Sequence, residues 1–221
     1  MKKVIAIDGP SGAGKSTIAK LLAKELGYSY LDTGALYRAV ALGLCRQGLN
    51  EDAGDTDIAR MLEKTSVSFR HGCVILNAHD VSGEIRTPEA SHFASVFSAR
   101  RPVREYLLDI QREASSHSDL VAEGRDMTTV VFPYAYRKFF LDASVEERVR
   151  RRSLELAAKG YELDEEKIRL EIIERDARDS ARDIAPLRIA DDAAVIESTG
   201  LTVDEVFRKI LTIINDRDGH I

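Results

Sequence analysis

The chain has few of the features that mark secreted, membrane or nucleic-acid-binding proteins. Its 221 residues include no tryptophan and only two cysteines. Cys45 and Cys73 lack the spacing of a metal site or a disulfide framework, so we expect two reduced thiols. A formal net charge of −5 supplies no positive excess for a nucleic-acid backbone. No apolar run reaches the roughly 20 residues that cross a membrane, and we expect a cytoplasmic protein.

The composition is that of an ordinary globular protein. Apolar residues make up 44% and charged residues 31% of the chain, and this length can bury a complete core. No repeat, low-complexity tract or linker divides the sequence. A single domain over residues 1–221 is therefore predicted.

The stretch Lys3–Thr17 is predicted to form a strand, a glycine-rich loop and the start of a helix. Val4–Ile7 is a short apolar run, and Gly9–Ser16 has the spacing of a phosphate-binding loop: glycine, four residues, glycine, lysine, serine. Lys15 is placed to neutralise β- and γ-phosphate oxygens, and the Ser16 hydroxyl to bind Mg²⁺. The alternative is a glycine-rich turn with a chance lysine, but the flanking strand and amphipathic helix favour nucleotide binding. The residues expected to contact the nucleotide are Gly9, Pro10, Ser11, Gly12, Ala13, Gly14, Lys15, Ser16 and Thr17.

Strand and helix patterns alternate along most of the chain. Besides the first strand, strands are predicted at 28–31, 119–123, 138–141 and 193–196. Helices are predicted at about 15–26, 35–47, 55–64, 88–98, 103–117, 145–158, 175–182 and 203–215. Five strands with intervening helices predict a three-layer α/β sandwich with a parallel sheet, of the P-loop NTPase type. Residues 67–70 and 74–76 flank His71-Gly72 as a hairpin and, with 81–86, predict a small antiparallel insert.

Several helix starts carry recognisable capping residues. Ser144 and Glu147 have the spacing of a capping box, and so do Thr202 and Glu205. Asp164 is predicted to cap the helix that follows it.

Polar residues follow two of the predicted strands. Thr33, with Tyr37 and Arg38 on the next helix, comes after the second strand, and Arg125 and Asp126 come after the third. The carboxyl ends of parallel strands meet at one edge of a sheet, where ligands bind. The alternatives are a packing or solvated role for Tyr37 and Arg38, and a surface ion pair between Arg125 and Asp126. Their common edge with the phosphate loop favours a binding site.

Arginines recur in the second half of the chain. Four lie between Arg148 and Arg152, while Arg175, Asp179 and Arg182 fall on one helix face. An internal salt-bridge ladder is one explanation, and a mobile flap over a transferring phosphate is the other. Phosphoryl transfer requires positioned cations more than a general base. If the acceptor is itself a phosphate, arginines such as Arg38 can clamp it through paired hydrogen bonds.

Five motifs together resemble the bacterial cytidylate kinase family over nearly the whole chain. They are Gly9–Ser16, Leu31–Arg38, Val81–Thr87, Gly124–Met127 and Arg175–Leu187. The resemblance implies transfer of a phosphoryl group from ATP to CMP or dCMP, with Mg²⁺. It also implies a small insert that binds the monophosphate and a helical lid. The net charge and the lack of a long apolar run argue against nucleic-acid and membrane partners, and we expect a monomer whose partners are these small molecules.

The same resemblance implies a role for each matching residue. Lys15, Arg125 and Arg182 would act on the transferring phosphate. Arg148, Arg151 and Arg152 match the lid region that serves the ATP phosphates, and of these Arg148 and Arg152 are expected to bind ATP. The implied acceptor site consists of Thr33, Tyr37, Arg38, Ser95, Arg104, Arg125, Asp126, Arg175, Asp179 and Arg182. Within it, Arg38, Arg125 and Arg182 hold the phosphate, Ser95, Arg104 and Asp126 contact cytosine, and Arg175 and Asp179 reach the sugar. Thr128 departs from the family, which usually has glycine there.

Two other function classes stay open from the residues. One is a P-loop kinase acting on a non-nucleotide acceptor such as shikimate or gluconate, or on dephospho-coenzyme A, although such chains usually lack the insert at 67–86. The other is a nucleotide-dependent switch or motor, which is expected to carry a magnesium aspartate or a basic nucleic-acid face. Turnover that depends on an acceptor distinguishes a kinase from a switch.

Overall fold

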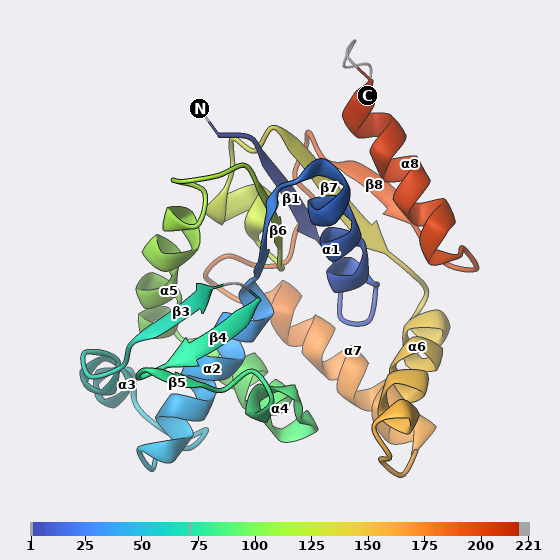
Figure 1. Ribbon diagram of the computed structural model, residues 1–221. Helices are drawn as coiled ribbons and strands as arrows, with labels where there is room; N and C mark the ends of the chain where they lie inside the picture. Colours follow the sequence, from blue (N-terminus) through green and yellow to red (C-terminus); the bar gives the residue numbers. More distant parts are fainter. Residues whose placement is uncertain (1, 71, 217–221) are drawn as a thin grey trace.

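A computed structural model describes residues 2–70 and 72–216 and is built on a five-stranded sheet (Figure 1). The strand order is β2-β6-β1-β7-β8, and every neighbouring pair is parallel. The strands are β1 (Val4–Asp8), β2 (Ser29–Asp32), β6 (Leu120–Glu123), β7 (Arg137–Asp142) and β8 (Ala194–Glu197). The predicted parallel α/β sheet is confirmed.

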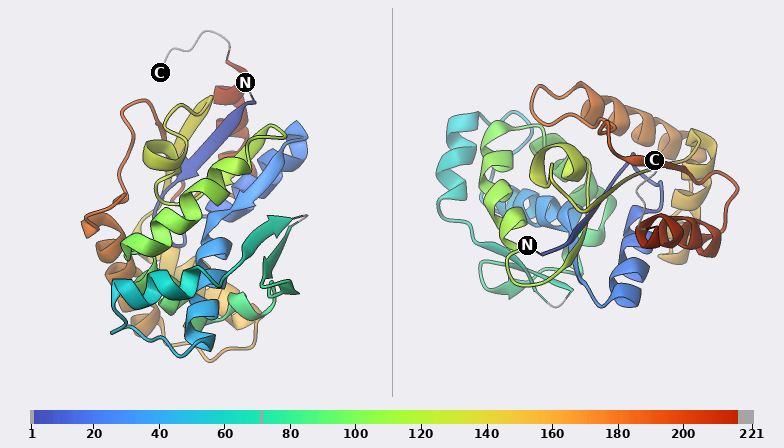
Figure 2. Two further views of the ribbon diagram at one scale, coloured as in Figure 1. Left: turned by 90° about the vertical axis from the view of Figure 1, so that its left-hand side faces the viewer. Right: turned by 90° about the horizontal axis from the view of Figure 1, so that it is seen from above.

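Helices cover both faces of this sheet (Figure 2). They are α1 (Lys15–Leu26), α2 (Thr33–Arg46), α3 (Asp55–Leu62), α4 (Pro88–Phe97), α5 (Arg101–Glu113), α6 (Val145–Ala158), α7 (Glu165–Ala181) and α8 (Val203–Asn215). Alternate side chains of β1 point to opposite faces. Ile5 and Ile7 pack with α1 and α8, whereas Val4 and Ala6 pack with α2 and α5. The three layers predicted from the sequence are therefore present.

Helix boundaries differ from the prediction where a polar side chain or a proline sets them. We expected α2 to begin near Ala35, but the Asp32 carboxylate accepts the Ala35 N–H at 2.8 Å and the helix begins at Thr33. We expected α5 at 103–117, but it begins at Arg101 with Pro102 in its first turn and ends at Glu113. Proline fits this position because the first-turn amides have no partner within the helix.

A small antiparallel sheet lies between α3 and α4. Strand β3 (Val67–Arg70) pairs with β4 (Cys73–Leu76), as predicted. His71, which we expected in the turn, lies outside the described residues. The third strand is β5 (His79–Asp80), and the prediction that 81–86 completes the sheet is wrong. The Asp80 carboxylate accepts the Ser82 N–H at 2.9 Å and turns the chain into a short 3₁₀ helix, η1 (Glu84–Arg86).

Helices α6 and α7 pack on each other away from the main sheet (Figure 1). Their contact is a separate apolar cluster of Val149, Leu156, Ile168 and Ile172. Both N-termini are capped as the sequence predicts, by Ser144 on α6 and by the Asp164 carboxylate on α7.

The reciprocal half of the capping box at Ser144 is absent. The Ser144 N–H donates to the Thr199 hydroxyl at 2.8 Å, and the Glu147 carboxylate binds Arg150 and Arg151 instead. The capping-box prediction at residues 144–147 is therefore half wrong, because two arginines one turn later compete for the carboxylate.

At the start of α8 both halves of the predicted capping box are present: the Thr202 hydroxyl accepts the Glu205 N–H and the Glu205 carboxylate accepts the Thr202 N–H. Replacing Thr202 with alanine leaves the Glu205 amide without its acceptor. We expect the free energy of unfolding in urea to fall by about 1 kcal/mol. Thr212→Ala is the matched control, because its hydroxyl bonds only within the same helix. Equal losses in the two variants would contradict this role for the cap.

The loop after β6 contains a feature that the sequence patterns did not predict. Met127–Val131 forms one turn of π-helix, η2, in which the Asp126 carbonyl accepts the Val130 and Val131 N–H groups. Both cysteines are free, as predicted. In the part of the chain that the structure describes, no helix has the length and apolarity required to span a membrane.

Candidate active site

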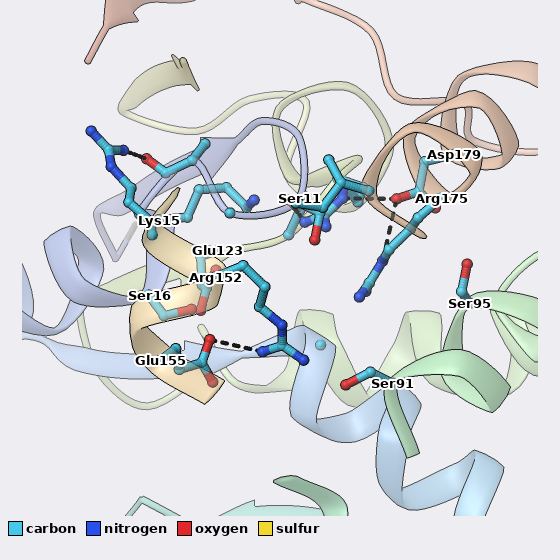
Figure 3. Close-up of a pocket in the computed structure, with 18 of the residues that line it drawn as sticks. Ser11, Lys15, Ser16, Ser91, Ser95, Glu123, Arg152, Glu155, Arg175 and Asp179 are labelled. Atoms are coloured by element: carbon cyan, nitrogen blue, oxygen red, sulfur yellow. Dashed lines mark hydrogen bonds and ion pairs between the residues drawn. The ribbon is translucent and has the colours of Figure 1, made fainter. Parts of the chain in front are cut away.

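A cavity of about 980 Å³ lies at the carboxyl ends of the sheet strands (Figure 3). The phosphate loop forms one wall, and α4 with the C-terminal part of α7 forms another. The predicted site residues that line it are Ser11, Gly12, Ala13, Gly14, Lys15, Ser16, Thr17, Thr33, Tyr37, Arg38, Ser95, Arg104, Arg125, Asp126, Arg152, Arg175, Asp179 and Arg182. Segments far apart in the sequence therefore converge on one space.

The backbone of the phosphate loop requires its glycines. Gly12 and Gly14 have φ angles of 79° and 94°, in the left-handed region that glycine tolerates. A Cβ atom on Gly9 would lie 2.0 Å from the Leu141 carbonyl oxygen, so the loop is packed closely against β7. Gly14 caps α1 without a side-chain acceptor. The N-terminal amides of α1 therefore have no side-chain cap, which is the arrangement that binds anions.

Lys15 is the buried cation of this wall. Its side chain is 5% exposed, and its Nζ donates to the Pro10 carbonyl at 2.6 Å. Burial lowers the pKa of Lys15, and the positive charge of Arg125 lowers it further, while the Glu123 carboxylate acts in the opposite direction. A phosphate anion in the loop would favour the charged ammonium in the same way.

Ser16 and Glu123 present oxygen atoms next to the loop. Ser16 lines the cavity, and Glu123, at the end of β6, is buried and accepts the Tyr30 hydroxyl at 2.9 Å. Burial and the charge of Asp32 raise the pKa of Glu123. Within residues 2–70 and 72–216 no cluster of three or more His, Cys, Asp or Glu side chains could enclose a metal. A hydroxyl with one carboxylate suits Mg²⁺, which takes few protein ligands and keeps its waters and phosphate oxygens.

Arginines surround a single carboxylate on the opposite wall. Asp179 accepts the Arg125 Nε–H at 2.9 Å and lies 3.6 Å from Arg182 Nη1 and 4.0 Å from Arg175 Nε. Three buried or half-buried cations thus share one anion. Burial and the charge of Arg125 lower the pKa of Arg175 to about 10. Arg175 Nε, Arg182 Nε and Nη2, and Arg38 Nε are buried and have no hydrogen-bond acceptor among the residues that the structure describes. This wall therefore offers excess positive charge and free N–H donors to an anion.

A polar pocket lies next to these arginines. Arg104 donates from Nη2 to Asp126 at 2.5 Å and from Nη1 to the Ser98 carbonyl at 2.9 Å. The Arg104 guanidinium stands 5.5 Å from the centre of the Tyr37 ring. The Ser95 hydroxyl is buried and has no hydrogen-bond partner within residues 2–70 and 72–216. Because a buried hydroxyl without a partner is costly, this pocket suits a ligand with its own donors and acceptors.

The structure also places several predicted residues away from the cavity. Gly9 and Pro10 shape the loop but do not line the space. Arg148 is buried and donates to the Ala143 and Ser11 carbonyls and to Asp176. Its role toward ATP stays a prediction. Thr33 lines the cavity, but its hydroxyl donates to the Glu123 carbonyl at 2.7 Å and ties α2 to β6.

Sequence reasoning left out Glu123, which lines the cavity, and did not decide which lid arginines face it. Glu123 ends a buried strand beside the predicted Arg125, and the strand-end rule that selected Arg125 also covers it. Arg151 lines the cavity and donates to the Ala13 carbonyl at 3.1 Å. No sequence signal distinguished Arg151 from its neighbours, because that choice depends on how α6 is rotated.

Comparison with known proteins shows to which family the chain belongs. A family model described as cytidylate kinase matches residues 5–216. The chain belongs to the cytidylate kinase family. A cytidylate kinase of Geobacter sulfurreducens is 49% identical over 219 residues, covering 97% of this chain and 94% of that protein. One from Carboxydothermus hydrogenoformans is 48% identical over 219 residues, covering 97% and 98%. The chain is accordingly an ATP-dependent kinase, a phosphotransferase, which excludes the switch class considered from the sequence.

A solved structure supports the fold alone. An uncharacterized protein from Eubacterium ventriosum aligns with a TM-score of 0.54 at 15% sequence identity, over 98% of this chain and 100% of that one. Its similarity extends to the arrangement of sheet and helices and carries no information about the substrate.

Proposed function

We propose that the protein transfers the γ-phosphoryl group of ATP to CMP or dCMP, giving ADP and CDP or dCDP. The observation that carries this proposal is the pairing of two anion-binding walls in one cavity. The phosphate loop with Lys15 forms one wall, and the arginines around Asp179 form the other. A kinase with a phosphorylated acceptor requires two such walls facing each other.

On the donor side, the loop amides and Lys15 hold the β- and γ-phosphates of ATP. Ser16 and Glu123 are the residues that would hold Mg²⁺, which when bound neutralises charge on the phosphate oxygens. Arg151 and Arg152 line the same space from the lid. These groups stabilise negative charge that spreads over the γ-phosphoryl oxygens during transfer.

On the acceptor side, Arg38, Arg125 and Arg182 hold the monophosphate. One of its oxygens attacks the γ-phosphorus as the bond to the β–γ bridging oxygen breaks, so ADP leaves with that electron pair. The attacking oxygen is already ionised, and therefore no strong general base is required. The arginines keep two anions close enough to react, which their mutual repulsion would otherwise prevent.

Polar groups next to the phosphate-binding arginines contact the base and the sugar of the acceptor. Ser95, with its unpartnered hydroxyl, and the Arg104–Asp126 pair offer both donors and an acceptor to the edge of cytosine. Arg175 and Asp179, beside the proposed phosphate clamp, would reach the sugar. Purines and uracil present different donors and acceptors, so they would leave buried groups of this pocket unpaired.

Closure of α6 and α7 over the cavity completes the proposed mechanism. The two helices form their own small apolar cluster and carry cavity-lining arginines. Movement of this pair as a unit, the lid, would exclude water from the transferring phosphate. We further propose that residues 1–221 act as one monomeric, cytoplasmic kinase domain, in keeping with the two unpaired cysteines and the family match over 5–216.

The test is ADP release from the purified protein with ATP and Mg²⁺, comparing CMP, dCMP, UMP, AMP and no acceptor. We expect CMP and dCMP to raise the rate by at least about 100-fold over the acceptor-free rate, since transfer to water lacks the positioned acceptor. Stimulation by AMP or UMP alone would contradict cytosine recognition by the Ser95 pocket. Equal rates with and without an acceptor would contradict the kinase mechanism.

A further inference from the structure

Asp8 is a buried carboxylate that the proposed mechanism does not use. It ends β1, immediately before the phosphate loop, and it has no exposed surface. Its Oδ1 accepts the Met127 N–H at 2.9 Å, and its Oδ2 accepts the Thr128 N–H at 2.7 Å and the Thr128 hydroxyl at 2.6 Å. All three donors belong to one dipeptide about half the chain away. The carboxylate is therefore a specific link between two segments.

This link joins the donor wall to the acceptor wall. Gly9 and the rest of the phosphate loop follow Asp8 directly, whereas Arg125 and Asp126 directly precede Met127. Arg125 binds Asp179, and Asp126 binds Arg104. The π-helical turn that begins at Met127 is also anchored by the Asp126 carbonyl. A shift of the Met127-Thr128 amides would therefore move two residues of the acceptor site.

A carboxylate at this position is costly to the fold. Burial raises the pKa of Asp8 to about 6, and the negative charge of Asp126 acts in the same direction, while the hydrogen bonds from Thr128 and Met127 oppose it. Because the folded-state pKa exceeds the ordinary value, ionisation of Asp8 lowers stability as the pH rises through about 6. An apolar residue would avoid this cost. The presence of a carboxylate at position 8 is therefore better explained by the positions in which it holds Met127 and Thr128 than by a contribution to stability.

We propose that Thr128 is a positioning residue of this kinase: its hydroxyl completes the binding of Asp8 and so sets Arg125 and Asp126 relative to the phosphate loop. This role rests on the proposed function, because its effect is on the use of the acceptor. Thr128 itself is 1% exposed and is not among the residues that line the cavity. It acts through the residues it holds.

Thr128→Val tests the hydroxyl at nearly unchanged volume, and Thr128→Ser is the matched control because it retains the hydroxyl. We expect Thr128→Val to lower kcat/KM for CMP by about tenfold, the effect of losing one hydrogen bond to a charged group. The KM for ATP should change less than about twofold, since the phosphate loop keeps its own contacts. Thr128→Ser should stay within about threefold of the wild type. Equilibrium ATP binding and thermal unfolding establish that each variant is folded.

The pH dependence of kcat/KM for CMP is a second measurement. A Thr128 that served only the stability of the fold would leave this pH dependence unchanged. The valine variant lacks one donor to the Asp8 carboxylate, so Asp8 should take up a proton at a higher pH than in the wild type. The charged groups that act on Asp8 are Asp126, which disfavours its ionisation, and Lys15, which favours it; both are retained. The acid limb of kcat/KM for CMP should therefore move to higher pH in Thr128→Val and not in Thr128→Ser.

The outcomes separate this role from the proposed function. A wild-type protein that does not turn over CMP overturns the proposed function, and the role of Thr128 with it. An active wild type whose Thr128→Val variant keeps its CMP kinetics and acid limb overturns only the role of Thr128. Equal losses toward CMP and ATP in a variant with lowered thermal stability also overturn it, because they indicate a general loosening of the fold.

Discussion

Replacement of Lys15 by alanine is expected to lower kcat for CMP phosphorylation by at least about 100-fold, comparable to the loss of one preorganised donor to a developing anion. Lys15 is buried and lines the donor wall, and in the proposed mechanism its ammonium neutralises the β- and γ-phosphates together with the N–H groups of the loop. Lys24→Ala, in the last turn of the same helix, is the control and should leave kcat within about twofold. Near-normal turnover of the Lys15 variant would contradict the phosphate-loop assignment.

The alkaline pH dependence gives a second readout on Lys15. Its pKa is lowered by burial and by Arg125, so the ammonium loses its proton at a lower pH than a free lysine, whose pKa is about 10.4. The charged form is the one proposed to bind phosphate, and it predominates only below the pKa. We therefore expect kcat/KM for ATP, which reports the free enzyme, to decline with rising pH well below 10.4. A flat profile up to that pH would contradict the lowered pKa.

The second large effect is expected at Asp179. Alanine at this position leaves Arg125, Arg175 and Arg182 buried without their common anion. Breaking a buried ion pair from one side typically costs about 3–5 kcal/mol, and we expect kcat/KM for CMP and for dCMP to fall together by about 100-fold or more. Asp183→Ala is the control, since Asp183 is exposed and does not line the cavity.

Thermal unfolding separates stability from catalysis in the Asp179 variant. The arginines hold the pKa of Asp179 below its ordinary value of 3.8, so its contribution to stability is present above that pH and is lost as the pH falls through the lowered pKa. The variant should be less stable than the wild type near neutral pH, and the difference should shrink in acid. If Asp179→Ala leaves kcat/KM unchanged for both CMP and dCMP, the assignment of Asp179 to the acceptor site is wrong.

Local features of the fold could be predicted because adjacent residues produce them. The glycines that permit left-handed backbone, the apolar run of β1 and the Thr202–Glu205 capping box each depend on a few neighbours in the chain. The rule that strand ends meet at one edge then placed Arg125 near the phosphate loop without any contact being known. Glu123 was missed because it was assigned to the predicted strand at 119–123, whereas the rule was applied only to residues after the strand.

Features that depend on packing were missed or misplaced. At Ser144 the capping motif was present, but Glu147 bound Arg150 and Arg151 instead. The run of arginines on α6 gave no indication of which ones face the cavity. In the structure Arg150, Arg151 and Arg152 line it, whereas Arg148 turns toward the backbone of the phosphate loop.

The sequence by itself determined the phosphate loop, the alternating α/β pattern and the arginine-rich chemistry, because residue type and spacing over a few positions specify backbone turns, helix faces and charge. Tertiary structure alone decided which charged groups meet. Asp8 reaches Thr128, and Asp179 of α7 reaches Arg125 after β6, because strand order and helix rotation bring together residues that are remote in the chain. Pairings between remote segments have no local signature, because no pattern of neighbouring residues specifies them.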